Sequence, residues 1–299
     1  MSEQSSHLLY LATEKPIVPI RRSRSELIKL LVGFAVIFLV AQFTGSVLDT
    51  CHDGACSGSL AEVLRTFILP IAWVGTAVVV ELLFFRSSLS QAIRELGFGL
   101  PRLRVVLISL LACLPALAFF PLFTQVTNTS LGLAPHWPWI LLSVAATNGI
   151  AEEVLFRGFL FRRLRATRPF LQAVLLSALF FSAAHLFLLA IYPPLFVALT
   201  VVLAVIVAFP FSYFFEQGGN TIWGSAIIHT VIDAAAFIVV LSPEVQGRAL
   251  SLYLLVSIGA TYVVYVLSSR LFPLQAHSLG NRRSRTSNAQ KGNNAITIE

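Results

Sequence analysis

Two adjacent carboxylates and an arginine lie inside a stretch of chain that is otherwise apolar enough to cross a lipid bilayer. Within residues 139–161 the sequence reads AEEVLFR at 151–157, which places Glu152, Glu153 and Arg157 among apolar neighbours. A charge buried in hydrocarbon costs several kcal/mol unless it is paired or reached by water. Ionisable residues in such a segment therefore indicate a functional site.

The composition is that of a membrane protein with several spans. Hydrophobic residues make up 57% of the 299 residues and charged residues only 12%. The charged share is about half of that of soluble domains, so no soluble class fits. The formal net charge is +7. Its basic residues lie between apolar segments and at the two ends of the chain, which argues against a nucleic-acid partner and for membrane orientation.

Eight apolar segments have about the 20 residues that a transmembrane helix needs. They lie at 27–48, 61–85, 105–124, 139–161, 170–190, 194–215, 222–241 and 250–271. We therefore predict an all-α, polytopic bundle of about eight transmembrane helices over residues 27–271. An N-terminal tail (1–26) precedes it. A basic tail rich in Ser, Asn and Arg (272–299) follows and is expected to be disordered.

The distribution of lysine and arginine predicts the orientation. With eight spans, the side opposite the termini holds only Arg65 and Arg248. The termini and the loops on their side carry the remaining lysines and arginines of the connecting segments. The positive-inside rule then places both termini in the cytoplasm. We expect a multi-pass protein of a bacterial inner (plasma) membrane, with membrane lipid as one partner.

The three cysteines divide into a pair and a single residue. Cys51 and Cys56 lie in the first loop, which the predicted topology places outside the cytoplasm, where disulfides persist. We therefore expect a disulfide between them. A metal site made of this short run, with His52 and Asp53, is a weaker interpretation because it has no second ligand cluster. Cys113 is expected to be a small core residue.

The two carboxylates of the opening segment are expected to differ in role. On an α-helix, Glu153 and Arg157 are four residues apart and face each other, which predicts a buried ion pair. The Glu152 side chain points about 100° away from Glu153 and has no partner on its own helix. It must meet a group on another span or hold water, which makes it a candidate general base.

Two later apolar segments carry the candidate partners of Glu152. His185 lies four residues after Phe181, and Asp233 lies one turn after His229. Small residues precede each histidine and would let helices approach closely. Taken alone, a histidine in a membrane helix more often forms a hydrogen bond to another helix than acts in catalysis. A glutamate, two histidines and an acid together point to chemistry.

Two kinds of chemistry fit this set. One is a divalent metal such as zinc, held by His185, His229 and a carboxylate of Glu152 or Asp233, with an open position for water. The other is direct activation of water by Glu152, with the histidines orienting the water and an oxyanion. Two histidines one turn apart with a glutamate between them, the zincin pattern, are absent, which favours the second.

Three motifs, taken in chain order, resemble those of the CAAX-protease and bacteriocin-processing (CPBP) family of intramembrane endopeptidases. They are Glu152-Glu153-x-x-x-Arg157, Phe181-x-x-x-His185 and His229-x-x-x-Asp233. The resemblance covers about residues 90–241. It implies cleavage of a protein or peptide substrate, which in this family includes lipid-modified ones, with Glu152 activating water and His185 and His229 as catalytic companions. That family often has asparagine where this chain has Asp233, whose extra charge needs a histidinium, a metal or a proton.

Two other classes of protein also place ionisable groups in a membrane. A proton-coupled transporter commonly shows paired halves with broken helices, whereas the ionisable set here lies in the second half of the chain. A non-catalytic scaffold or a bacteriocin self-immunity protein would keep the fold and use the polar cluster to hold helices together. The ordered set of motifs favours the protease.

Overall fold

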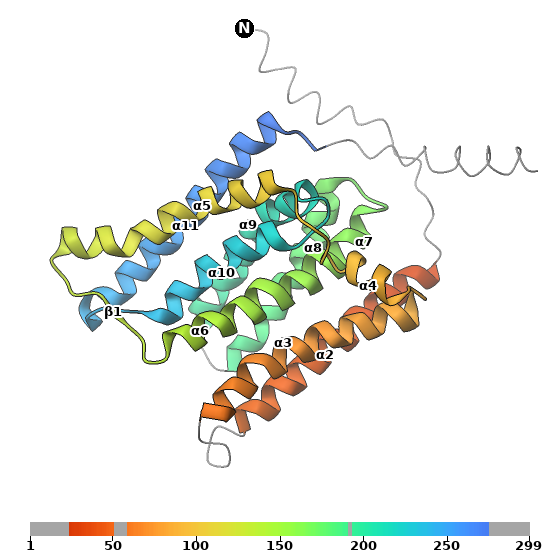
Figure 1. The fold of residues 1–299 in the computed structure, drawn as a ribbon, viewed down its shortest axis with the longest axis horizontal. Coiled ribbons are helices and arrows are strands. Elements are labelled where there is room, and N and C mark those ends of the chain that lie inside the picture. Colours follow the sequence, from red (N-terminus) through yellow and green to blue (C-terminus); the bar gives the residue numbers. More distant parts are fainter. Residues whose placement is uncertain (1–23, 51–58, 191–192, 275–299) are drawn as a thin grey trace, which may run out of the picture. The chain divides into compact units, whose positions relative to one another are not determined.

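The computed structural model describes residues 24–50, 59–190 and 193–274. The predicted Cys51–Cys56 disulfide and most of both predicted tails lie outside the described residues. Within them the chain is an all-α bundle, as predicted, and Cys113 is a free, buried cysteine. Figure 1 shows the helices as a bundle with α10 between α5, α6 and α9.

The described elements follow one another with short connections. They are α2 (Arg24–Thr50), α3 (Ser59–Phe84), α4 (Leu89–Glu95), α5 (Leu103–Thr127), β1 (Gly132–Leu133), α6 (Trp137–Val144), the π-helical segments η2 (Ala145–Glu152) and η3 (Val154–Phe161), α7 (Arg162–Arg165), α8 (Phe170–Ala184), the 3-10 turn η4 (His185–Ala190), α9 (Pro194–Gln217), α10 (Trp223–Ile238), β2 (Val239–Val240) and α11 (Pro243–Leu271).

Seven of the eight predicted spans are long and apolar enough to cross a membrane. The eighth is shorter than predicted, because α10 has 16 residues, or about 24 Å of helix, against about 30 Å of hydrocarbon. It ends where Val239 takes an extended conformation and pairs, antiparallel, with Leu133. The segment 222–241 is therefore a short helix followed by a strand.

One end of the bundle gathers the connections that the predicted topology assigns to one side. The Ile222 N–H donates to the Gly97 carbonyl at 3.1 Å, and the side-chain amide of Gln217 donates to the Phe272 carbonyl at 3.0 Å. At the opposite end, β1 and β2 join the α5–α6 connection to the end of α10. Although it is short, α10 therefore runs from one end of the bundle to the other.

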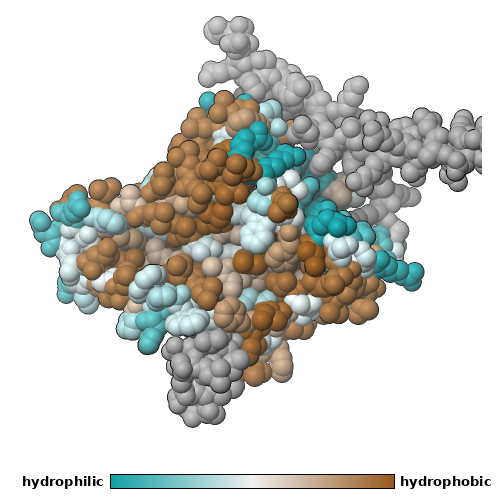
Figure 2. Space-filling view, viewed as in Figure 1, coloured by the Kyte–Doolittle hydropathy of each residue, from teal (hydrophilic) through white to brown (hydrophobic). Residues whose placement is uncertain are grey.

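The helix surfaces are those of an integral membrane protein. Large apolar side chains such as Phe43, Leu83 and Val126 are mostly exposed, which is unfavourable in water and expected against lipid. Figure 2 shows a largely hydrophobic surface, with hydrophilic residues gathered toward the ends of the helices. The apolar helices and this surface agree with the predicted multi-pass membrane location.

The helix that carries the paired glutamates lies at the centre of the packing. It runs without a break from α6 through η2 and η3 into α7, at residues 137–165, and η3 is buried along its whole length. Phe156 packs against Phe181 of α8, with ring centroids 4.6 Å apart, and Phe161 packs against Phe215 of α9 at 6.0 Å. Much of this helix has π-helical hydrogen bonding, which is rare and concentrated at functional sites.

A glycine on this helix sets how closely α10 can approach it. A Cβ atom added to Gly149 would collide with the Thr230 hydroxyl and would lie 3.2 Å from the Ala226 carbonyl oxygen, both on α10. Because α10 also carries His229 and Asp233, the missing side chain of Gly149 brings these residues within reach of the paired glutamates.

We expect Gly149→Ala to separate η2 from α10, because the new methyl group meets backbone as well as a side chain. Thermal denaturation in detergent should show a loss of stability on the order of 1–3 kcal/mol. Gly75→Ala is the matched control, because nothing lies within 4 Å of a Cβ atom at Gly75 in α3. Equal melting temperatures for the two variants would contradict the role of Gly149 in the close approach of α10 to η2.

Candidate active site

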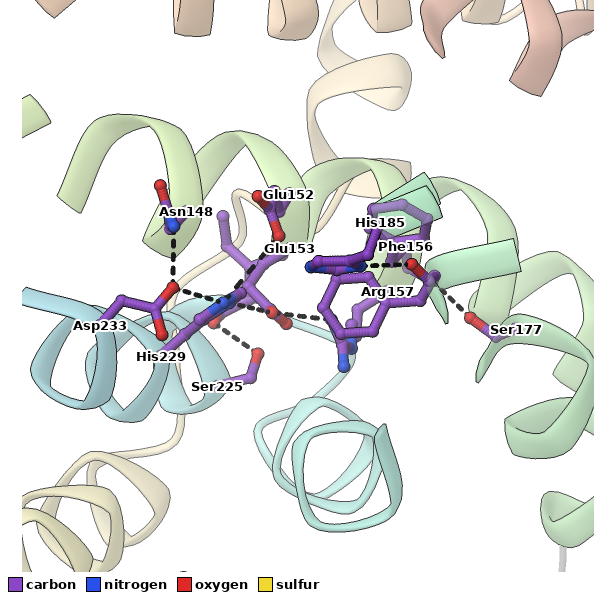
Figure 3. A network of polar contacts seen from close by, with 12 residues as sticks. Asn148, Glu152, Glu153, Phe156, Arg157, Ser177, His185, Ser225, His229 and Asp233 are labelled. Atoms are coloured by element: carbon purple, nitrogen blue, oxygen red, sulfur yellow. Dashed lines mark hydrogen bonds and ion pairs between the residues drawn. The ribbon is translucent and has the colours of Figure 1, made fainter. Parts of the chain in front are cut away.

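The residues that the sequence singled out lie together in the middle of the bundle. η2, η3 and the residue between them carry Glu152, Glu153 and Arg157, the end of α8 leads into His185, and α10 carries His229. Figure 3 shows these side chains pointing toward one another from the three helices. Segments that are more than 70 residues apart in the sequence thus form one polar cluster inside an apolar bundle.

Glu153 is the centre of this cluster. Its Oε1 atom accepts a hydrogen bond from Arg157 Nη1 at 2.8 Å and lies 2.9 Å from Nδ1 of His229. Glu153 and Arg157 are both buried, so the predicted ion pair is present. The sequence did not reveal that the same carboxylate also holds the histidine of α10.

Two aromatic rings enclose the guanidinium of Arg157. The Phe181 centroid lies 4.7 Å and the Phe211 centroid 5.0 Å from its central carbon. The Phe211 ring also lies 5.3 Å from the His229 ring. Cation–π contacts of this kind stabilise a cation that has lost its water. Phe181 was predicted to belong to the site, whereas Phe211 of α9 carries no signal in the sequence beyond being apolar.

Glu152 stands apart from this pair, as its position on the helix predicted. Its Oε2 atom lies 3.9 Å from Nε2 of His229, and its side chain keeps 16% of its surface exposed. This distance is too long for a direct hydrogen bond but suits two groups bridged by a water molecule. The carboxylate therefore has a polar partner on another helix and some access from outside.

Asp233 and an asparagine complete the cluster on its outer side. Asp233 Oδ2 lies 3.3 Å from Nε2 of His229 and accepts a hydrogen bond from Nδ2 of Asn148 at 2.7 Å. Asn148 was missed at the sequence level. Its signal would have been an amide inside an apolar helix, four residues before Glu152.

The His229 ring is held between carboxylates on both sides. Its Nδ1 atom faces Glu153 and its Nε2 atom faces Asp233. A neutral imidazole donates from one nitrogen only, whereas the imidazolium donates from both. The geometry therefore favours the histidinium as the positive charge that balances Asp233.

His185 is oriented by its own helix end. Its Nδ1 atom lies 2.7 Å from the Phe181 carbonyl oxygen, and its ring packs edge-on against the Phe181 ring at 5.0 Å. Donation from Nδ1 to this carbonyl leaves Nε2 without a hydrogen-bond partner among the described residues. The Phe181 ring also lies 6.2 Å from the His229 ring, so one phenylalanine sets the positions of both imidazoles.

Three of the four imidazole nitrogens of the candidate metal ligands face oxygen atoms of the protein. Within the part of the chain that the structure describes, no three His, Cys, Asp or Glu side chains are arranged to hold one ion. Both nitrogens of His229 face carboxylates, and Nδ1 of His185 faces a backbone carbonyl. The alternative site at Cys51, His52, Asp53 and Cys56 lies outside the described residues. The zinc site considered for Glu152, His185, His229 and Asp233 therefore stays a prediction.

Three arginines that follow the predicted span 139–161 belong to the same helix. The helix continues through α7, where Arg163 lies 2.5 Å from Glu81 of α3, and Arg165 lies 3.0 Å from Glu216 of α9. Both arginines are buried. Arg162, less buried, bonds to Glu95 of α4 at 3.0 Å. The helix therefore extends four residues beyond the predicted end of the span at residue 161, and acids on neighbouring elements pair these charges.

Comparison with known families agrees with this geometry. Residues 134–235 match the family model described as type II CAAX prenyl endopeptidase Rce1-like. The resemblance to the CPBP family is confirmed over this segment. The Rce1-like segment is about a third of the chain and contains the whole polar cluster from Asn148 to Asp233. The match supports an intramembrane endopeptidase of the CAAX type. No curated protein matches the chain.

We expect Glu153→Ala and Arg157→Ala each to destabilise the protein, because removing one partner strands the other charge in a buried site. The expected loss is about 3–5 kcal/mol, measured by thermal or denaturant unfolding in detergent.

The double variant Glu153→Leu/Arg157→Met is the matched control. It leaves neither charge of the pair and should be more stable than Glu153→Ala, because both variants lose the contact of Glu153 with His229 and only the single variant strands Arg157. Single variants that melt like the wild type would mean that the pair is unimportant for folding.

Proposed function

We propose that this chain hydrolyses a peptide bond within the membrane by means of water activated by Glu152. The position of Glu152 is the observation that carries the proposal. It is the partly exposed carboxylate beside a fully buried ion pair, and it faces a histidine across a gap that suits water. A base must be able to reach both water and substrate, and Glu153, which is buried and paired, cannot do so.

The chemistry follows from the positions of the side chains. Glu152 accepts a proton from water while the water oxygen forms a bond to the peptide carbonyl carbon, which gives a tetrahedral intermediate with a negatively charged oxygen. The C–N bond then breaks, and Glu152 returns the proton to the leaving nitrogen. The products are a carboxylic acid and an amine. No step requires an oxidant or a cofactor.

The two histidines serve the charge that develops on the carbonyl oxygen. The His229 imidazolium, whose two N–H groups face Glu153 and Asp233, places its positive charge close to Glu152. The Nε2 atom of His185 can bind the attacking water or the substrate. Preorganised groups of this kind stabilise an oxyanion strongly because they need no reorientation during the reaction. Asn148 acts through Asp233 as a positioning residue.

The substrate class that we propose is a lipid-modified protein or peptide. The Rce1-like description names prenyl endopeptidases, and this cluster lies among apolar helices, where a prenyl chain would be soluble. A suitable probe is a short peptide that ends in a farnesylated cysteine and three further residues. The same peptide without the farnesyl group tests whether the lipid is needed.

We expect Glu152→Gln in lipid nanodiscs to lose at least about a hundredfold in cleavage of the farnesylated peptide, which is the usual contribution of a general base. Its melting temperature should stay close to that of the wild type. His185→Ala and His229→Ala should also lose activity. Cleavage products are to be identified by mass spectrometry.

The same assay separates this proposal from its competitors. Wild-type cleavage should persist in the membrane-permeant chelator 1,10-phenanthroline, and its loss with recovery on adding zinc would support the metal mechanism instead. Near-wild-type cleavage by Glu152→Gln would refute the proposed base. An intact wild type that cleaves neither peptide, together with a Glu152→Gln variant that unfolds, would favour a non-catalytic scaffold or self-immunity protein.

We also propose that α4 lies on the cytoplasmic side, as the arginine distribution predicts. In a variant without native cysteines, a cysteine at the exposed Arg94 of α4 should resist a membrane-impermeant maleimide in intact cells. A cysteine at the exposed Ser130, between α5 and β1, is the control and should react. The reverse pattern would mean that the orientation is inverted.

A further inference from the structure

A groove lies between the first turns of α2 and the end of α3, outside the Rce1-like segment. Its volume is about 360 Å³. It is lined by Ile28, Lys29, Val32, Leu83, Phe84 and Arg86. Four of these side chains are apolar and two are cationic, so the groove combines a hydrophobic wall with positive charge.

The positive charge of the groove is not fully neutralised by the protein. Lys29 pairs with Glu26 of its own helix at 2.8 Å. Among the described residues, no hydrogen bond or ion pair engages the guanidinium of Arg86, whose side chain is exposed. Arg86 also has a left-handed backbone, with φ of 53°, which is uncommon for a residue with a side chain. A cation in a groove and without a partner favours an anionic ligand.

The apolar wall narrows the class of that ligand. Ile28, Val32 and Leu83 are exposed large hydrophobic residues that line the same groove. Free phosphate or a nucleotide would leave this wall uncovered, and a neutral lipid would leave Arg86 without a counter-ion. An anionic head group attached to acyl chains satisfies both halves.

The position of the groove in the fold also fits an anionic lipid. Lys29 lies one turn into the first candidate span, and Arg86 lies two residues after the second, so both are at the level where lipid head groups meet the hydrocarbon. Basic pockets between transmembrane helices at this level are typical sites for anionic lipids.

We propose that this groove binds an anionic phospholipid, with its phosphate on Arg86 and Lys29 and its acyl chains along Ile28, Val32 and Leu83. The proposal does not depend on the proposed protease activity, because none of these residues belongs to the polar cluster. The predicted orientation, with both termini and α4 on the cytoplasmic side, would place the bound lipid in the cytoplasmic leaflet.

The test uses the purified full-length protein in a neutral detergent. We expect phosphatidylglycerol to raise the melting temperature and to remain bound in native mass spectrometry, and phosphatidylcholine with the same acyl chains to do much less. Arg86→Gln should lose most of the shift and Lys29→Gln/Arg86→Gln nearly all of it. Arg94→Gln is the matched control, an exposed arginine outside the groove, and should respond like the wild type.

A further variant separates the two halves of the site. Val32→Trp fills the apolar wall and keeps both cations, so it should also lose phosphatidylglycerol binding, while Arg86→Lys should keep much of it. Phosphatidylglycerol shifts of wild-type size in Arg86→Gln and in the double variant would overturn the proposal. So would an equal response to phosphatidylcholine, or an equal shift by inorganic phosphate alone.

Discussion

The rest of this molecule depends on the contacts of one buried carboxylate, that of Glu153. One oxygen atom bonds to Arg157 on its own helix and to His229 on α10. A carboxylate without water in an apolar bundle is tolerable only with such partners, and each partner is tolerable only with the carboxylate. The two helices are therefore joined by charge as well as by packing, and the joint fixes the histidine beside Glu152.

The apolar residues around this joint decide its geometry. Gly149 allows α10 to approach, while Phe181 and Phe211 enclose Arg157 and contact the His229 ring. Because protein interiors are densely packed, these rings leave the charged groups few alternative positions. Glu152 and Asp233 are partly exposed, and the Asp233 side chain keeps 28% of its surface exposed. Their exposed atoms mark where the cluster can meet water or substrate.

A second set of charges connects the Rce1-like segment, residues 134–235, to the rest of the bundle. Arg163 pairs with Glu81 of α3, and its guanidinium lies 3.9 Å from the Phe85 ring centroid. Arg165 pairs with Glu216 of α9. α3 lies outside the segment that matches the Rce1-like family. The first helices of the chain are thus held to the family segment by a buried ion pair, and they form the groove that we assign to an anionic lipid.

The sequence by itself singled out the charged residues of the polar cluster and predicted the apolar helices that hold them. Charged residues are so costly among apolar ones that Glu152, Glu153 and Arg157 stand out in one dimension, and the spacing of four residues was enough to predict the ion pair. The lengths of the apolar segments likewise predicted the helices of the bundle, because the thickness of a bilayer fixes how long a span must be.

The tertiary structure alone decided how the helices meet. That Glu153 also holds His229, that Asn148 bonds to Asp233, and that Arg163 is buried against Glu81 are contacts between segments tens of residues apart, for which local spacing gives no signal. The π-helical winding was equally hidden, and so was the short α10, whose end is set by the pairing of β2 with β1. Sequence periodicity reports the face of a helix, whereas the partner on that face is set by the three-dimensional packing of the whole bundle.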